Sequence, residues 1–312
     1  MLPHTFTMVC PVLTNGGTKN IYRDFINNAA SLVFYDWAFI YLGDDMEYIL
    51  SLSYGKDSMA CLGAIEKLNL PLDRIVSVEV WATKDVHGDL PEMIEFKSYA
   101  DKIIKDRYGI SVEHICAAEY DMYGNFIRNK NFEDDVFYRV RKSGKRAGEF
   151  SGWPAIGYPA CNAELKRPIF RMIGRKGNVQ YLGIAADEKN RHNQLSEKKV
   201  SPLVLAGWTE NDCYNWCVEN ELLSPIYSMS ARGGCWFCQN QSMQQLRTLR
   251  NNYPDLWEIM LRLDKDSPNK FISDGRTIHD CGKRFFCENA GLLDPKKRFM
   301  WKNLDKIDVP GF

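Results

Sequence analysis

The fold is decided by the stretch EYILSLSYGKDSMACLGAIEKL, residues 47–68. Its first part, residues 47–53, is apolar and β-prone, as expected of a buried parallel strand. Residues 59–68 repeat apolar side chains at helical spacing. Residues 54–58 form a turn between them. The stretch therefore predicts a strand that passes through a short turn directly into a helix.

The segments that follow extend this unit. Further strands are expected at residues 75–80, 110–115 and 179–186, and a long amphipathic helix at residues 91–108. Strands that alternate with helices indicate a parallel sheet with right-handed crossovers. The expected fold class is therefore α/β, with an open, mainly parallel, twisted sheet flanked by helices.

The chain of 312 residues divides into three expected parts. Residues 1–45 form an N-terminal extension of unclear role, residues 46–207 the α/β domain, and residues 208–312 a smaller, mostly helical region that bears cysteines. Within the α/β domain, residues 120–160 lack periodicity and are predicted to be a functional lid or a disordered loop.

Composition narrows the class of protein. Forty basic and 40 acidic side chains give no net charge, which argues against binding nucleic acid by bulk electrostatics. No stretch approaches the roughly 20 apolar residues of a membrane helix, because the best candidate, residues 31–42, is short and contains Asp36. The N-terminus does not resemble a secretory signal. We expect a cytoplasmic protein that does not insert into a membrane.

The turn SYGKDS carries the first functional signal. It lies between a strand and a helix N-terminus, where unpaired N–H groups and the helix dipole favour an anion. Gly55 allows close approach of a phosphate, the hydroxyls of Ser53 and Ser58 can donate to it, and Lys56 adds positive charge. The turn is too short for a Walker A loop. The alternative is an ordinary strand–helix turn that holds a lysine.

SYGKDS resembles the SGGKDS loop of the PP-loop ATP pyrophosphatase superfamily, with Tyr54 in place of the first glycine. Three further segments resemble the branch of that superfamily similar to PAPS (phosphoadenosine phosphosulfate) reductase. They are GYPACNAELKRPIF from residue 157, YLGIAADEKNR from residue 181, and the block from residue 200 that ends in SPIYSMSARGGCWFC at residue 238.

The resemblance implies a fold like the adenine nucleotide α-hydrolases, with ATP or PAPS and Mg²⁺ at the carboxyl ends of the strands, as is general for such sheets. Lys56, Asp57 and Arg191 would be catalytic. Glu188 would bind Mg²⁺ or orient Arg191. The residues that the resemblance assigns to nucleotide binding are Ser53, Tyr54, Gly55, Lys56, Asp57, Ser58, Val80, Trp81, Lys166, Arg167, Gly183 and Glu188. For Lys166, Arg167 and Arg191, a solvated surface is the alternative.

Ten cysteines are many for a cytoplasmic chain, and clustered ones there indicate metal or redox chemistry. Cys235 and Cys238 form a CxxC pair, a half-site for zinc or iron–sulfur. The resemblance adds Cys161, because iron–sulfur sulfonucleotide reductases pair a cysteine at that place with a later CxxC. An iron–sulfur cluster is expected, with zinc or reduced structural thiols as alternatives.

The identity of the fourth ligand of this metal centre is undecided. The reductases carry adjacent cysteines where this chain has Ala160 and Cys161, so we expect the ligand from Cys281 or Cys287. Cys281 is preferred because Gly282 eases a ligand turn. A three-thiolate cluster with one free iron is the alternative. The other cysteines are expected to pack in cores, with the last two on one helix face: Cys10, Cys61, Cys116, Cys213 and Cys217.

Three functions fit these residues. The first is an ATP pyrophosphatase that adenylates an acceptor, releases pyrophosphate and thereby prepares sulfur transfer. The second is reduction of PAPS or its 3′-dephosphorylated form, which the resemblance ties to a cysteine in a C-terminal tail; residues 292–312 contain none. The third is a non-catalytic nucleotide-binding module with a structural zinc.

The implied partners are an adenine nucleotide, a sulfur-donor protein and a nucleic-acid acceptor. The last is suggested by relatives in DNA phosphorothioation and tRNA thiolation, by analogy only. Interleaved aromatic and basic residues suit single-stranded nucleic acid, although a solvated surface is the alternative. The two stretches concerned are Arg139, Arg141, Lys142, Lys145 and Arg146, and Lys296, Lys297, Arg298, Phe299, Trp301 and Lys302.

Overall fold

The computed structural model describes residues 46–155, 160–174, 177–196, 198–229, 233–272, 274–294, 297 and 299–309. The chain divides into two compact units, Met1–Met46 and Glu47–Phe312, and everything below concerns the second. The expected N-terminal extension and Cys10 lie outside the described residues.

A parallel five-stranded sheet forms the centre of this unit, in the order β3-β2-β1-β6-β7. The expected mainly parallel sheet flanked by helices is therefore confirmed. Strands β2 and β3 lie on one side of β1, and β6 and β7 lie on the other, so the order of the strands reverses between β1 and β6. The strands are β1 (Tyr48–Leu52), β2 (Arg74–Glu79), β3 (Val112–Cys116), β6 (Val179–Tyr181) and β7 (Lys199–Val200).

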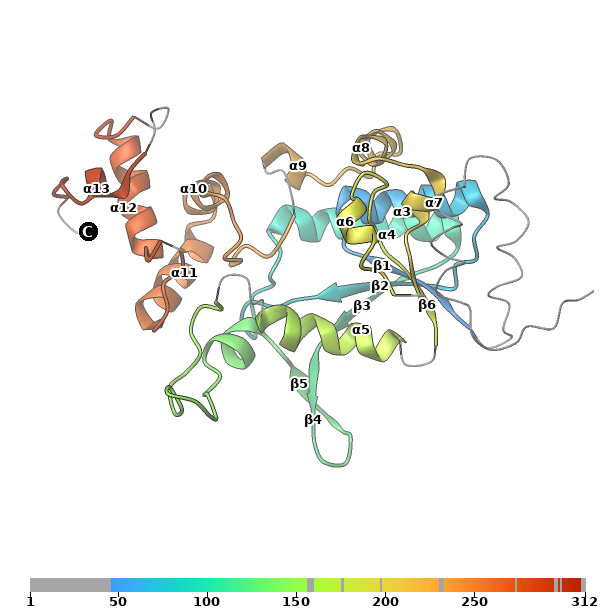
Figure 1. Cartoon of the computed structure of the whole chain (residues 1–312), viewed down its shortest axis with the longest axis horizontal. Helices are drawn as coiled ribbons and strands as arrows, with labels where there is room; N and C mark the ends of the chain where they lie inside the picture. The colour runs from blue at the N-terminus through green and yellow to red at the C-terminus, as the bar shows by residue number, and fades with distance from the viewer. Residues whose placement is uncertain are drawn as a thin grey trace, which may run out of the picture. The chain divides into compact units, whose positions relative to one another are not determined.

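Helices cover both faces of the sheet (Figure 1). On one face, α5 (Arg167–Gly174) packs Ile169 and Ile173 against Ile49 and Val76. On the other face lie α3 (Lys56–Leu68) and α4 (Pro91–Tyr108). Because side chains alternate along a strand, Ser77 and Glu79 of β2 lie on the face opposite Val76, toward α4.

Two further helices, α7 (Pro202–Ala206) and α8 (Glu210–Glu219), pack on α3. A Cβ at Gly63 would lie 2.2 Å from Nε1 of Trp216, so the indole rests directly on the backbone of α3. Cys213 and Cys217 are both fully buried, which confirms the predicted packing on one helix face. The predicted boundary at residue 207 falls between these two helices, which belong to the same layer.

Helices α10 (Met243–Asn252), α11 (Pro254–Asp266) and α12 (Ile278–Asn289) share a second core with the segment expected to be a lid or a disordered loop. The disordered loop is wrong for the described residues 120–155. They include β5 (Phe126–Asn129), which with β4 (Ala118–Tyr120) forms a hairpin, and the π-helical turn η1 (Glu133–Phe137). Phe132, Phe137 and Trp153 are buried, and Phe132 stacks on Phe237 at 4.4 Å. Aromatic burial, rather than periodicity, orders this segment.

A buried carboxylate joins two of these helices. Asp264 on α11 accepts hydrogen bonds from the backbone N–H of Ile278 (2.9 Å) and His279 (3.3 Å) at the start of α12. It also accepts one from Nε1 of Trp153 at 3.1 Å. Thr277 and Asp280 form a capping box on the same helix start. No described helix is long and apolar enough to cross a membrane.

Candidate functional site

The turn after β1 is closed by its own serines. The N–H of Ser53 donates to Oγ of Ser58 at 3.1 Å, and the two hydroxyl oxygens are 3.0 Å apart. Oγ of Ser58 also donates to the carbonyl of Gly55 at 3.0 Å. The two hydroxyls predicted to contact a phosphate thus hold the turn in shape in this structure.

Gly183 brings a second strand end against this turn. A Cβ there would lie 2.5 Å from the amide nitrogen of Ser58 and 2.7 Å from the carbonyl carbon of Asp57, so only glycine fits. The contact joins the ends of β1 and β6, between which the order of the strands reverses. In open α/β sheets, ligands bind in the crevice at this place. The sheet thus brings the predicted SYGKDS turn and Gly183 together where a ligand is expected.

The side chain of Lys56 is held by acids. Its Nζ lies 2.8 Å from Oδ1 of Asp57 and 2.8 Å from Oε2 of Glu210 on α8. Burial opposes the charge of Lys56, but these two hydrogen bonds outweigh it and raise its pKa. The pKa of Asp57 is raised, first by burial and further by Glu210 and Glu188, although Lys56 opposes this. Asp57 therefore lies close enough to two other carboxylates, Glu210 and Glu188, for them to oppose its ionisation.

The backbone N–H of Lys56 also has a hydrogen-bond partner. Its N–H donates to the hydroxyl of Tyr227 at 2.9 Å. Tyr227 lies on the short helix α9 (Ile226–Met229). Sequence analysis did not assign a role to Tyr227 or Glu210, although both fall within the long segment that carries the resemblance.

Tyr54 has an unusual backbone. Its φ is +57°, in the left-handed region, and its side chain is fully buried. For a bulky residue this conformation costs on the order of 1–3 kcal/mol. Its hydroxyl donates to Asp101 on α4 and lies 3.3 Å from Nε2 of His114 on β3. Burial, and then the bond to Asp101, raise the pKa of Tyr54, so the phenol keeps its proton.

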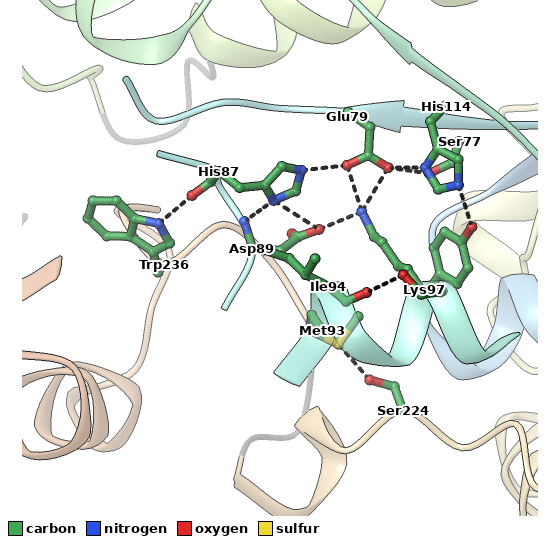
Figure 2. Close-up of polar contacts among 12 residues, drawn as sticks. Ser77, Glu79, His87, Asp89, Met93, Ile94, Lys97, His114, Ser224 and Trp236 are labelled. Atoms are coloured by element: carbon green, nitrogen blue, oxygen red, sulfur yellow. Dashed lines mark hydrogen bonds and ion pairs between the residues drawn. The ribbon is translucent and has the colours of Figure 1, made fainter. Parts of the chain in front are cut away.

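Beneath the turn, Glu79 forms a buried polar network (Figure 2). Its carboxylate accepts from Nζ of Lys97 at 2.8 and 2.9 Å. It lies 2.6 Å from Nε2 of His87 and 2.7 Å from Nδ1 of His114. Burial opposes the charge of Glu79, but these partners outweigh it and lower its pKa. Hydrogen bonds to Asp101 and Glu79 raise the pKa of His114 to about 9.

Glu79, His87 and Asp89 offer ligand atoms within 4.8 Å of one another, as a metal site would. However, Nζ of Lys97 lies 2.8 Å from Glu79 and 2.6 Å from Asp89. Nδ1 of His87 accepts the N–H of Asp89 at 3.0 Å. The ammonium group supplies the positive charge that these carboxylates require, and a ring nitrogen is already used. These residues form a salt-bridge network and do not fit a metal.

The same network reaches the CxxC turn. Trp236, which lies between the two cysteines, donates from Nε1 to the carbonyl of His87 at 2.8 Å. Its backbone N–H donates to the carbonyl of Gly88 at 2.9 Å. Cys235 and Cys238 are thereby fixed to the segment that follows β2, at the carboxyl end of the sheet.

Cys161, Cys235 and Cys238 lie near one another and near Lys166. The pKa of Cys161 is raised by burial and then by Cys238. The pKa of Cys235 is raised by burial to about 12, which Lys166 opposes and the two other thiols reinforce. Among the described residues, these thiols do not form a set with all ligand atoms within 4.8 Å. They are neighbouring thiols, more widely spaced than the ligands of a single metal ion.

Cys281, the preferred fourth ligand, has different surroundings. It is fully buried on α12, and the charged groups that act most on its thiol are Asp280, Arg284 and Asp264. Cys287 is buried in a separate apolar cluster with Leu304. Cys281 belongs to the core against which Cys161 and Cys235 pack, but it is not among the groups that act on the pKa of either thiol. Cys287 lies outside that core.

The other predicted residues have surroundings of several kinds. Glu188 pairs with Arg191 at 2.6 Å and also accepts the N–H of Ala185 at 3.2 Å. The pair agrees with a role in orienting Arg191, and binding of Mg²⁺ stays the alternative prediction. The Arg191 side chain is 59% exposed. Val80 is buried in the second core, while Trp81 packs edge-on against His87 at 5.2 Å. Lys166 lies by the thiols, and Arg167 is exposed on α5.

The arginines of the first basic stretch are engaged within the chain, whereas Lys142 and Lys145 are exposed. Arg139 pairs with Glu164, and Arg146 pairs with Glu149 at 2.6 Å. The guanidinium of Arg284 lies 3.8 Å from the ring centre of Phe299, and that of Arg276 lies 5.4 Å from Trp301. These rings are covered by the chain's own cations rather than open to bases. Lys296 and Arg298 lie outside the described residues.

No protein-family model matches this chain, and a search of curated proteins finds no match either.

Proposed function

We propose that this chain is a nucleotide-binding protein of the PAPS reductase-like branch of the PP-loop superfamily, which binds ATP at the SYGKDS turn. One observation carries the proposal. The turn follows the central strand, contacts Gly183 where the order of the strands reverses, and presents Lys56 at a helix N-terminus. A phosphate there would meet both the helix dipole and an ammonium group.

The proposed reaction is adenylation. An oxygen of the acceptor attacks the α-phosphorus of ATP, the bond to the bridging oxygen breaks, and pyrophosphate leaves with the electron pair. Lys56 would stabilise the charge that develops on the phosphates. The activated acceptor would then be attacked by sulfur, with AMP as the leaving group.

The residues present suit two further cofactors, a magnesium ion and a metal centre bound by thiolates. Glu210 and Glu188 act electrostatically on Asp57, and such hard oxygen donors suit Mg²⁺, which would neutralise phosphate charge. Cys161, Cys235 and Cys238 offer soft thiolates that suit an iron–sulfur cluster or zinc. Lys166 would favour the ionised form of Cys161 and Cys235. An iron–sulfur cluster could supply sulfur binding.

A second candidate is a nucleotide-binding module without turnover. This candidate is favoured because both polar groups of Lys56 already have protein partners: its side chain pairs with Glu210, and its backbone N–H donates to Tyr227. Reduction of PAPS is less favoured. Cys281 and Cys287 are fully buried, and a thiol that attacks a sulfonucleotide has to reach it.

Release of pyrophosphate on incubation with ATP, Mg²⁺ and a panel of acceptors tests the proposal. Lys56→Ala should abolish release, whereas Lys102→Ala, an exposed lysine on α4, should retain it. Binding of ATP without release across the panel would favour the module. Sulfite formed from PAPS with thioredoxin would favour the reductase. Unchanged release by Lys56→Ala would refute the role of the turn.

A further inference from the structure

Tyr54 combines two features that oppose each other. Its backbone adopts a left-handed conformation that disfavours a bulky side chain, and yet the side chain is fully buried in the turn of the candidate site. A strained residue persists only where its surroundings over-determine it, and such residues cluster at functional sites. The contacts of Tyr54 therefore indicate why its backbone is held in a strained conformation.

The ring of Tyr54 is fixed on several sides. His114 stacks on it with ring centres 6.1 Å apart, Phe96 packs edge-on at 6.5 Å, and Nζ of Lys97 lies 5.3 Å from its centre. These residues come from β3 and α4, which are rigid elements of the domain. The ring is thus clamped between the sheet and a covering helix.

The hydroxyl of Tyr54 is anchored to charged groups. It donates to Asp101, whose other oxygen lies 2.8 Å from Nε2 of His114. His114 in turn is 2.7 Å from Glu79, which Lys97 neutralises. A hydroxyl bonded to this network is held more firmly than a core phenol would be, because hydrogen bonds to charged groups are about twice as strong as neutral ones.

We propose that Tyr54 is a positioning residue of the phosphate-binding turn: anchored by Asp101 and His114, it fixes the backbone of Gly55 and Lys56 in the orientation that receives the ligand. The inference rests on the proposed function of the turn. A tyrosine that only filled the core would need neither the left-handed backbone nor the charged anchor. Tyr54 itself would not touch the nucleotide.

Tyr54→Phe in the full chain tests this, because it keeps the ring and removes the anchor. Without ligand, hydrogen exchange of the peptide covering residues 53–58 should speed up about tenfold, as expected for loss of a hydrogen bond to a charged group. The dissociation constant for ATP with Mg²⁺ should rise by a similar factor. Tyr120→Phe on the exposed hairpin (60% exposed) is the matched control and should change neither quantity.

Asp101→Ala provides a second variant on a partly exposed side chain, should Tyr54→Phe fail to fold. It should reproduce both effects, and the double variant should show no further loss, because the two residues act through one bond. Unchanged exchange at residues 53–58, or faster exchange with unchanged ATP affinity, would overturn the positioning role. If the wild-type chain binds no nucleotide, the proposed function of the turn fails, and with it the positioning role, whereas loss of affinity in the variants alone supports both.

Discussion

The hydroxyl of Tyr227 accepts a hydrogen bond from the backbone N–H of Lys56 across 2.9 Å. This contact links two segments separated by 171 residues. Lys56 opens α3 at the SYGKDS turn, and Tyr227 lies on α9, only a few residues before Cys235. The contact therefore ties the turn to the segment that leads into the CxxC pair.

Tyr227→Phe should free this N–H for a phosphate oxygen. Since a helix N-terminus binds anions through such donors, we expect a 3- to 10-fold rise in affinity for ATP or pyrophosphate, a gain of about 1 kcal/mol. Titration calorimetry of the variant and the wild type measures it. A fall in affinity would instead indicate that the hydroxyl donates to the bound ligand.

Glu210→Gln should release the side chain of Lys56 from one of its two acids. The ion pair spans 2.8 Å, but Glu210 is half-exposed, so its loss costs little stability, about 0–1 kcal/mol. We expect pyrophosphate to bind several-fold more tightly in the absence of Mg²⁺. Glu219→Gln, an exposed acid on the same helix, is the control. Weaker binding by Glu210→Gln would contradict the competition between Glu210 and phosphate.

The stability of the protein should depend on pH through His114. Its pKa rises from the usual 6.5 to about 9, so its charged form stabilises the fold fully below pH 6.5. This contribution is lost as the pH rises through 9. Because the side chain is 35% exposed, solvent screening limits the effect to roughly 1–2 kcal/mol. Urea unfolding of wild type and His114→Gln should differ by this amount at pH 6 and converge at pH 10. A constant difference across this range would contradict the assignment.

Removal of thiols should separate the metal candidates. Cys235→Ser should lose metal bound after anaerobic purification, measured as iron, sulfide and zinc per chain. Cys281→Ser should retain it, because Cys281 lies in the apolar core beside its own helix charges. Loss of metal in Cys281→Ser at unchanged thermal stability would restore Cys281 as a ligand. Zinc without sulfide would exclude the cluster.

Asp264→Ala should destabilise the C-terminal helices. The carboxylate accepts three hydrogen bonds, from Trp153, Ile278 and His279, and its removal leaves buried donors unpaired. Such losses cost about 2–4 kcal/mol in total. Asp255→Ala, an exposed acid in the first turn of α11, should cost less than about 0.5 kcal/mol. Equal losses in thermal unfolding would show that Asp264 is dispensable.

Local patterns predicted four of the five strands of the sheet; β7 was missed, and the strand expected at residues 179–186 ends at Tyr181. The helix expected at residues 91–108 has the bounds Pro91–Tyr108, and the strand expected at residues 75–80 is β2, Arg74–Glu79. These elements carry their signals within a short window: a proline at the first helical position and an apolar β-prone run. The turn and Gly183 were likewise recognisable because each belongs to a compact motif.

The network beneath the turn could not be predicted in the same way. Glu79, Lys97, Asp101 and His114 come from β2, α4 and β3, and only the parallel register brings Glu79 beside β3. In the sequence each is an isolated charged residue. The burial of Phe132 and Trp153 was missed for a related reason, since their spacing follows neither helical nor strand periodicity.

The contact between Gly63 and Trp216 sets the spacing of two helices. Glycine inside a helix is unfavourable by about 1 kcal/mol relative to alanine, yet a methyl group at this position would overlap the indole. The helix seated there begins with Glu210, and the helix beneath it begins with Lys56. A bulkier side chain at position 63 would push the upper helix outward and carry the acid away from the lysine. Gly63 thus controls the Lys56–Glu210 ion pair, which lies two helical turns away.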